Sequence, residues 1–195
     1  MQLMIYGLFV FLGVHVLPVI FPRWRQRQIE RFGERPWKAV FAVVALIGLV
    51  LVCVGFGRAR QLPLMLYSPP QAMDHLNALF TLVAFVLLAA AYVPGNHIKS
   101  ALGHPMLLGV VVWASGHLLA TGMLHDVVLF GAFLSWALPM AVWLRLRDRL
   151  AGVRYAAGTL RGDTLAVAIG TAAWVVFAFW LHRWLIGVDP MPGMH

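Results

Sequence analysis

The chain has 195 residues, of which 62% are hydrophobic and only 11% are charged, and its mean hydropathy is +0.83. A soluble domain is nearer half apolar, so this composition excludes an ordinary soluble protein and indicates an integral membrane protein. The formal net charge is +8, but the bases lie in loops between apolar stretches, which argues against nucleic acid as a partner. The single cysteine, Cys53, excludes an intrachain disulfide.

Six apolar stretches are long enough to cross a bilayer, which takes roughly 20 residues of helix. In chain order they cover residues 3–21, 37–56, 73–93, 105–123, 127–144 and 164–186. The first has no basic segment before it and no small-residue cleavage site after it, so we expect a retained helix rather than a cleaved signal. The segment "RLAGVRYAAGTLRGD" could lie along the inner membrane surface as a short amphipathic helix. The sequence therefore predicts an all-α bundle of about six transmembrane helices, forming a single domain over residues 1–195.

The basic residues predict the orientation of this bundle. Of the 15 lysines and arginines, all but Arg58, Arg60 and Arg183 lie in the first, third and fifth loops. Positively charged loops stay on the cytoplasmic side. Both chain termini are therefore expected on the outer, periplasmic side.

The chain has eight histidines, and six of them are predicted near the membrane surfaces or at the chain end. These six are His75, His97, His104, His125, His182 and His195. Histidines at an interface are usually solvated, and that is the expected state of each. Two metal sites remain as alternatives: a pair formed by His97 and His104, or an outer site formed by His75, His125 and His182.

His15 and His117 differ because both lie inside apolar stretches, where ionisable residues are rare and usually face a partner. One interpretation is a neutral histidine hydrogen-bonded to a neighbouring helix. The other is a pair of neutral imidazoles that bind a haem iron from both sides within the bundle. Trp113, one turn before His117, and the adjacent Gly116 would then line the cofactor site, because small residues let a flat macrocycle approach the backbone as readily as they let helices pack. The chain has no C-x-x-C-H motif, so the haem would be b-type.

The depths of the two histidines do not match closely. At about 1.5 Å per residue, His15 lies roughly 10 Å, and His117 roughly 18 Å, from the inner ends of their predicted spans. Helix tilt, or a kink at Pro18, would bring the two histidines to a similar depth in the membrane. Otherwise His104 or Met106 is the alternative partner of His15.

Three segments resemble the NnrU family of bacterial membrane proteins, which is related to the plant ζ-carotene cis–trans isomerase. They are "FLGVHVLP" in the first span, "RFGERPWKAVFAVVAL" leading into the second, and "HPMLLGVVVWASGHLLATG" in the fourth, with a weaker match in "DHLNALF". The last segment is the most specific, although Thr121 stands where many relatives have asparagine. The resemblance implies a b-type haem with His15 and His117 of the W-x-x-x-H motif as axial ligands. His104 matches the family's His-Pro and would support the site or substitute as a ligand.

The resemblance also implies a bacterial inner-membrane location and a link to denitrification and nitric-oxide metabolism. The first functional hypothesis is therefore a haem-b membrane protein of nitrogen-oxide metabolism. Such a protein would lie in the lipid bilayer and have a redox partner. The second is a haem-dependent cis–trans isomerase that acts on a polyene or another hydrophobic small molecule. The third is a haem-free scaffold or transporter in which the buried histidines make a polar contact.

Overall fold

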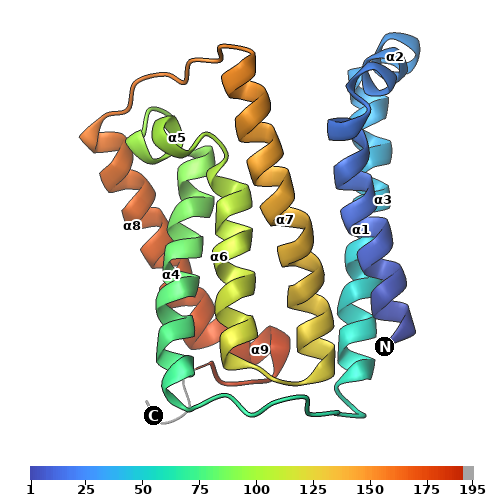
Figure 1. The fold of residues 1–195 in the computed structure, drawn as a ribbon, viewed down its shortest axis with the longest axis vertical. Helices are drawn as coiled ribbons and strands as arrows, with labels where there is room; N and C mark the ends of the chain where they lie inside the picture. Colours follow the sequence, from blue (N-terminus) through green and yellow to red (C-terminus); the bar gives the residue numbers. More distant parts are fainter. Residues whose placement is uncertain (191–195) are drawn as a thin grey trace. The chain divides into compact units, whose positions relative to one another are not determined.

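A computed structural model of the chain describes residues 1–190, and these residues form helices with no named strand. Five helical segments are long and apolar enough to cross a membrane. They are α1 (Gln2–Ile20), α3 (Glu34–Ala59), α4 (Ala72–Tyr92), α7 (Leu124–Leu150) and the segment Leu160–Ile186 (Figure 1). The predicted all-α membrane fold is confirmed.

The fourth predicted span is shorter than expected. Helix α6 (Pro105–Ala120) has 16 residues, which is about 24 Å at the usual rise, against a hydrocarbon core of about 30 Å. The helix ends because Thr121 adopts an extended backbone. The prediction that this span continues to residue 123 was therefore wrong.

Two helices were not predicted from the sequence, and one that had been considered is not present. Helix α2 (Pro22–Phe32) follows α1 directly and carries the first basic cluster, while the six-residue α5 (His97–Leu102) lies before α6. Residues 151–159 form no helix, so the amphipathic surface helix considered for "RLAGVRYAAGTLRGD" is wrong. Gly152 follows the end of α7 with φ of +66°, a conformation that glycine adopts without strain.

The contacts divide the chain into two compact units. The first comprises residues 1–66 and 123–132, and the second comprises residues 67–122 and 133–195. Helix α7 contributes its first residues to one unit and the rest to the other. The expectation of a single domain stays a prediction.

In the first unit, α1 and α3 pack side by side through glycines (Figure 1). A Cβ atom at Gly55 would lie 2.3 Å from the backbone nitrogen of Met4, and one at Gly48 would lie 2.7 Å from that of Phe11. Only glycine allows backbones this close, and small residues at such contacts are typical of membrane helices. This packing fixes α1, and with it His15, against α3.

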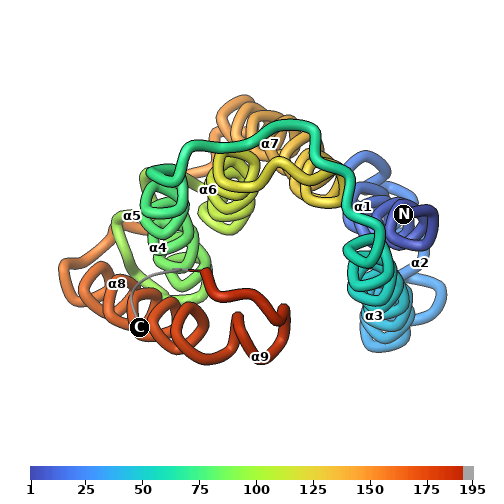
Figure 2. Tube along the Cα trace, turned by 90° about the horizontal axis from the view of Figure 1, so that it is seen from below, coloured from blue at the N-terminus to red at the C-terminus, as the bar shows by residue number. Residues whose placement is uncertain are grey.

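In the second unit, α4 lies between α6 and α8 (Leu160–Val176) (Figure 2). Gly170 of α8 meets the backbone of Val86, and the indole of Trp174 donates a 3.0 Å hydrogen bond to the hydroxyl of Thr81. After α8 the chain makes one π-helical turn, η1 (Phe177–Leu181), and continues as α9 (His182–Ile186). Such a turn shifts the helical register, so it rotates every side chain that follows it.

Candidate functional site

His15 is half-buried on α1, with its ring held by both the backbone and two phenylalanines. Its Nδ1 lies 2.6 Å from the carbonyl oxygen of Phe11. The ring centroid is 4.5 Å from that of Phe11 and 5.1 Å from that of Phe41 on α3. A carbonyl oxygen can only accept, so Nδ1 carries the proton and donates it, and Nε2 is the nitrogen with the lone pair.

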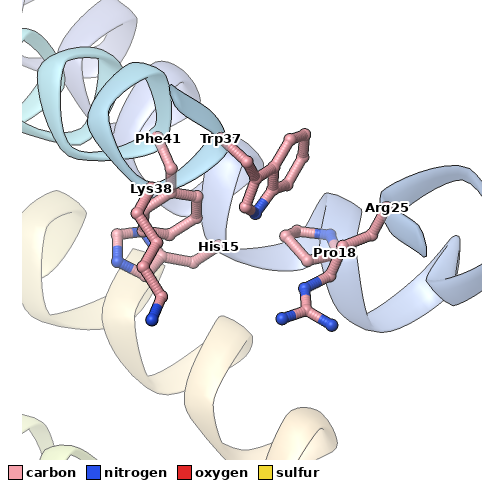
Figure 3. Close-up of a pocket in the computed structure, with 6 residues that line it drawn as sticks. All are labelled: His15, Pro18, Arg25, Trp37, Lys38 and Phe41. Carbon is pink, nitrogen blue, oxygen red and sulfur yellow. The ribbon is translucent and has the colours of Figure 1, made fainter. Parts of the chain in front are cut away.

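An open hollow of about 280 Å³ lies beside His15 within the first unit. Figure 3 shows the six residues that line it: His15, Pro18, Arg25, Trp37, Lys38 and Phe41. The ammonium of Lys38 also forms a 2.8 Å ion pair with Glu34, on the exposed side of α3. The hollow therefore combines an imidazole, apolar rings and two cations.

His117 belongs to the second unit and lies in the last turn of α6. Its Nδ1 is 2.9 Å from the carbonyl oxygen of Trp113, and the two rings are in contact with centroids 5.3 Å apart. Trp113 in turn meets Phe133 edge-on, with centroids 5.4 Å apart. His117 thus has the same proton arrangement as His15, with the proton on Nδ1 and the lone pair on Nε2.

The end of α6 that carries His117 is capped by Tyr67. The phenol of Tyr67 donates to the carbonyl oxygens of Leu118 and Thr121, which are among the carbonyls left unsatisfied at a helix terminus. The hydroxyl of Thr121 donates a 2.8 Å hydrogen bond to the carbonyl of His117. Sequence reasoning missed Tyr67, which lies in a loop far along the chain from α6.

His182 lies near His117, although the sequence suggested only a solvated residue at a membrane surface. The two imidazoles are close enough to interact electrostatically. Nδ1 of His182 donates to the carbonyl oxygen of Val188 at 2.8 Å, so its Nε2 also holds the lone pair. The π-helical turn directly before His182 sets the direction of this side chain, and no sequence pattern indicated that turn.

Gly116 packs against α4 in this structure. A Cβ atom at Gly116 would lie 2.6 Å from Oδ1 of Asn77 and 2.7 Å from Cβ of Phe80. Asn77 Oδ1 is itself buried without a hydrogen-bond partner among the described residues. Gly116 therefore serves helix packing here, and its predicted role beside a cofactor stays a prediction.

His104 is held by a carboxylate that the sequence did not single out. Its Nε2 lies 2.9 Å from Oδ2 of Asp148, a residue near the end of α7, and the phenol of Tyr155 donates to the same oxygen. Arg145 donates a 2.7 Å hydrogen bond to the carbonyl of Ala101 and lies over the Tyr155 ring. Burial, and next the hydrogen bond to Asp148, raise the pKa of the Tyr155 phenol. Because its Nε2 is bound to Asp148, His104 links the start of α6 to the end of α7.

Three other histidines that the sequence predicts at the membrane surfaces differ in their burial. His97 is exposed and donates from Nδ1 to Asp163 at 2.7 Å, so His97 and His104 bind separate carboxylates rather than pair. His125 is buried, with a relative exposure of 6%, and lies edge-on to Phe56, so its prediction as a solvated residue was wrong. His75 is exposed.

No group of three or more histidine, cysteine or acidic side chains able to hold a metal ion occurs among residues 1–190. The alternative outer site formed by His75, His125 and His182 thus finds no support in that range. His195 lies outside the described residues. A site with two histidine ligands to haem iron needs no such group.

The family model described as "NnrU protein" matches residues 3–190. The chain therefore belongs to this family, as the segments around His15 and His117 suggested. No curated protein and no solved structure matches the chain.

Proposed function

We propose that this member of the NnrU family is a haem-b membrane protein, with His15 and His117 as the two axial ligands of the iron. The observation that supports this most is the arrangement shared by the two imidazoles. Each donates its Nδ1 proton to the carbonyl four residues earlier, at 2.6 Å and 2.9 Å. Such a hydrogen bond fixes the tautomer and orients a metal-binding histidine through its other nitrogen.

The surroundings of both residues fit a haem. Phe11 and Phe41 flank His15, and Trp113 flanks His117, so each imidazole is in contact with at least one aromatic ring. Histidine is a normal axial ligand of haem, and helical bundles are a common place for such a site.

A haem held by His15 and His117 would supply one-electron chemistry. The residues of this chain would orient the two imidazoles through the hydrogen bonds from their Nδ1 atoms to the carbonyls of Phe11 and Trp113. We place this function in nitrogen-oxide metabolism at the bacterial inner membrane, as the family resemblance implies. The polyene isomerase and the haem-free scaffold stay predictions from the sequence.

His182 is the competing second ligand, because the structure brings it near His117 within one unit. Along the helices, His15 lies five residues before the end of α1, and His117 lies twelve residues after the start of α6. These spacings correspond to about 8 Å and 18 Å, so two-histidine ligation would require helix tilt, or a bend at Pro18, to make up a difference of about 10 Å. The experiment therefore includes His182.

The test measures haem per polypeptide after purification in mild detergent and loading with hemin. The variants are His15→Ala, His117→Ala and His182→Ala, with His75→Ala as a control because His75 is exposed. We expect the first two to bind haem about tenfold more weakly or worse, and added imidazole to restore their spectra. His182→Ala and the control should match the wild type.

Full haem retention in both His15→Ala and His117→Ala would contradict the proposal. Loss in His117→Ala and His182→Ala, with retention in His15→Ala, would replace His15 by His182 as the second ligand.

A further inference from the structure

The hollow beside His15 is strongly asymmetric in charge. Of its six lining residues, Arg25 and Lys38 are cationic and none is acidic. Figure 3 shows that the guanidinium and the ammonium are directed to the same side of the hollow. Arg25 comes from α2 and Lys38 from α3, so two helices bring these cations together beside an imidazole from a third.

One carboxylate is shared by the two cations. Glu34 pairs with Lys38 at 2.8 Å and also interacts electrostatically with Arg25. The side chains of Lys38 and Glu34 are 69% and 61% exposed, and ion pairs this exposed contribute little. The hollow thus keeps a net positive charge that a ligand with carboxylates or phosphates would neutralise.

The rest of the hollow is apolar. Pro18, Trp37 and Phe41 line it, and Trp37 meets Trp24 of α2 edge-on with ring centroids 5.3 Å apart. The hollow lies where the apolar span of α1 gives way to the basic α2. A ligand that fits it has an apolar body next to His15 and anionic groups at the membrane surface.

Haem b has this character, because its macrocycle is apolar and its two propionates are anionic. Resting on the function proposed above, we propose that Arg25 and Lys38 bind the two propionate carboxylates of the haem that His15 ligates. The guanidinium offers a planar fork to one carboxylate. The ammonium, on its flexible stem, reaches the other from the apolar wall. The two cations thereby set which edge of the haem faces the aqueous surface.

The test compares hemin with hemin dimethyl ester, which lacks both carboxylate charges. Dissociation from the full-length protein in detergent is followed by transfer to an excess of apomyoglobin. The variants are Arg25→Gln and Lys38→Gln, singly and together. Arg27→Gln and Arg35→Gln are matched controls, because these bases lie on α2 and α3 outside the lining of the hollow. Bound phospholipid is measured as phosphorus in every sample.

We expect each lining variant to release hemin about fivefold faster, as the loss of one exposed ion pair would cause. The position of the Soret band should not change, since the axial ligands are untouched. The ester should leave the wild type faster than hemin does, and the double variant should release hemin and ester at equal rates.

Equal rates for hemin and its ester in the wild type would overturn the inference, as would lining variants that behave like the controls. Loss of bound phospholipid in the lining variants, with hemin release unchanged, would assign the hollow to an anionic lipid instead. These results leave the bis-histidine haem in place. A wild type that binds no haem would instead overturn the proposed function, and this inference with it.

Discussion

Asp148 accepts hydrogen bonds from three other side chains, although its own side chain is only 9% exposed. His104 lies at 2.9 Å and Arg147 at 3.0 Å, and Tyr155 donates to the same carboxylate. These donors come from the start of α6, from α7 itself and from the segment that follows α7. The carboxylate therefore joins three parts of the second unit that are distant in sequence.

Replacing Asp148 by Asn should lower the free energy of unfolding by about 2–3 kcal/mol, because hydrogen bonds to a charged group are lost where little water reaches. Tyr155→Phe should cost less, about 1 kcal/mol, since one hydrogen bond is lost and the other donors remain. Thermal unfolding in detergent measures both effects. Tyr92→Phe is the control, because Tyr92 is 76% exposed. An Asp148→Asn variant that unfolds at the wild-type temperature would disprove this role.

The same contact predicts a pH dependence. Burial and the Asp148 hydrogen bond raise the pKa of Tyr155 above its ordinary value of 10.0, so the folded state favours the protonated phenol. This stabilisation is fully present below about pH 10 and is lost as the pH rises through the folded-state pKa. The difference in melting temperature between the wild type and Tyr155→Phe should therefore shrink above pH 10. A difference that stays constant from pH 8 to pH 11 would contradict the assignment.

At the scale of elements, the contact between α1 and α3 depends on glycine. A Cβ atom at Gly55 would lie 2.3 Å from the backbone of Met4, whereas one at Gly57, on the same helix, would meet nothing within 4 Å. Gly55→Ala should push the helices apart and cost about 1–3 kcal/mol, the usual range for overpacking. Gly57→Ala should be neutral or slightly stabilising, because alanine is the better helix former. Thermal unfolding of the two variants tests this, and equal melting temperatures would refute it.

Hydropathy predicted the membrane helices well because each is continuous in sequence and the bilayer sets its length. Helix α2 was missed because "PRWRQRQIERF" is mostly charged and polar, so a search for apolar spans passes over it. The early end of α6 was missed because it is stabilised by a tertiary contact. The phenol of Tyr67, in a loop distant in sequence, donates to the carbonyl oxygens of Leu118 and Thr121. Apolar composition continues beyond Ala120 and gives no such signal.

The candidate site was predictable only in part, for a related reason. His15 and His117 stand out because an imidazole in an apolar stretch is unusual in any sequence. The partners of His104 and His97 are Asp148 and Asp163, which lie 44 and 66 residues away and are brought close by folding alone. His182 depends on the register shift of η1, which sequence does not encode in a recognisable pattern.

For the whole molecule, the distribution of bases predicts that α2 faces the cytoplasm and the loop after α3 faces outward. This is testable with single cysteines in a Cys53→Ser background, which removes the chain's own thiol. A membrane-impermeant maleimide should label Ser68→Cys in intact cells. It should label Gln28→Cys only after the cells are permeabilised. The reverse pattern would invert the topology and would place the Arg25 and Lys38 hollow on the outer side.

The most direct measurement of the central claim is the absorption spectrum of the purified wild type, oxidised and then reduced with dithionite, with a pyridine haemochrome assay on the same sample. The account predicts a six-coordinate low-spin b-type spectrum in both oxidation states, at one haem for each polypeptide, because His15 and His117 both ligate the iron. A featureless spectrum after expression with added haem precursor would contradict it. In that case the two imidazoles would be structural, each held by its hydrogen bond to the helix backbone.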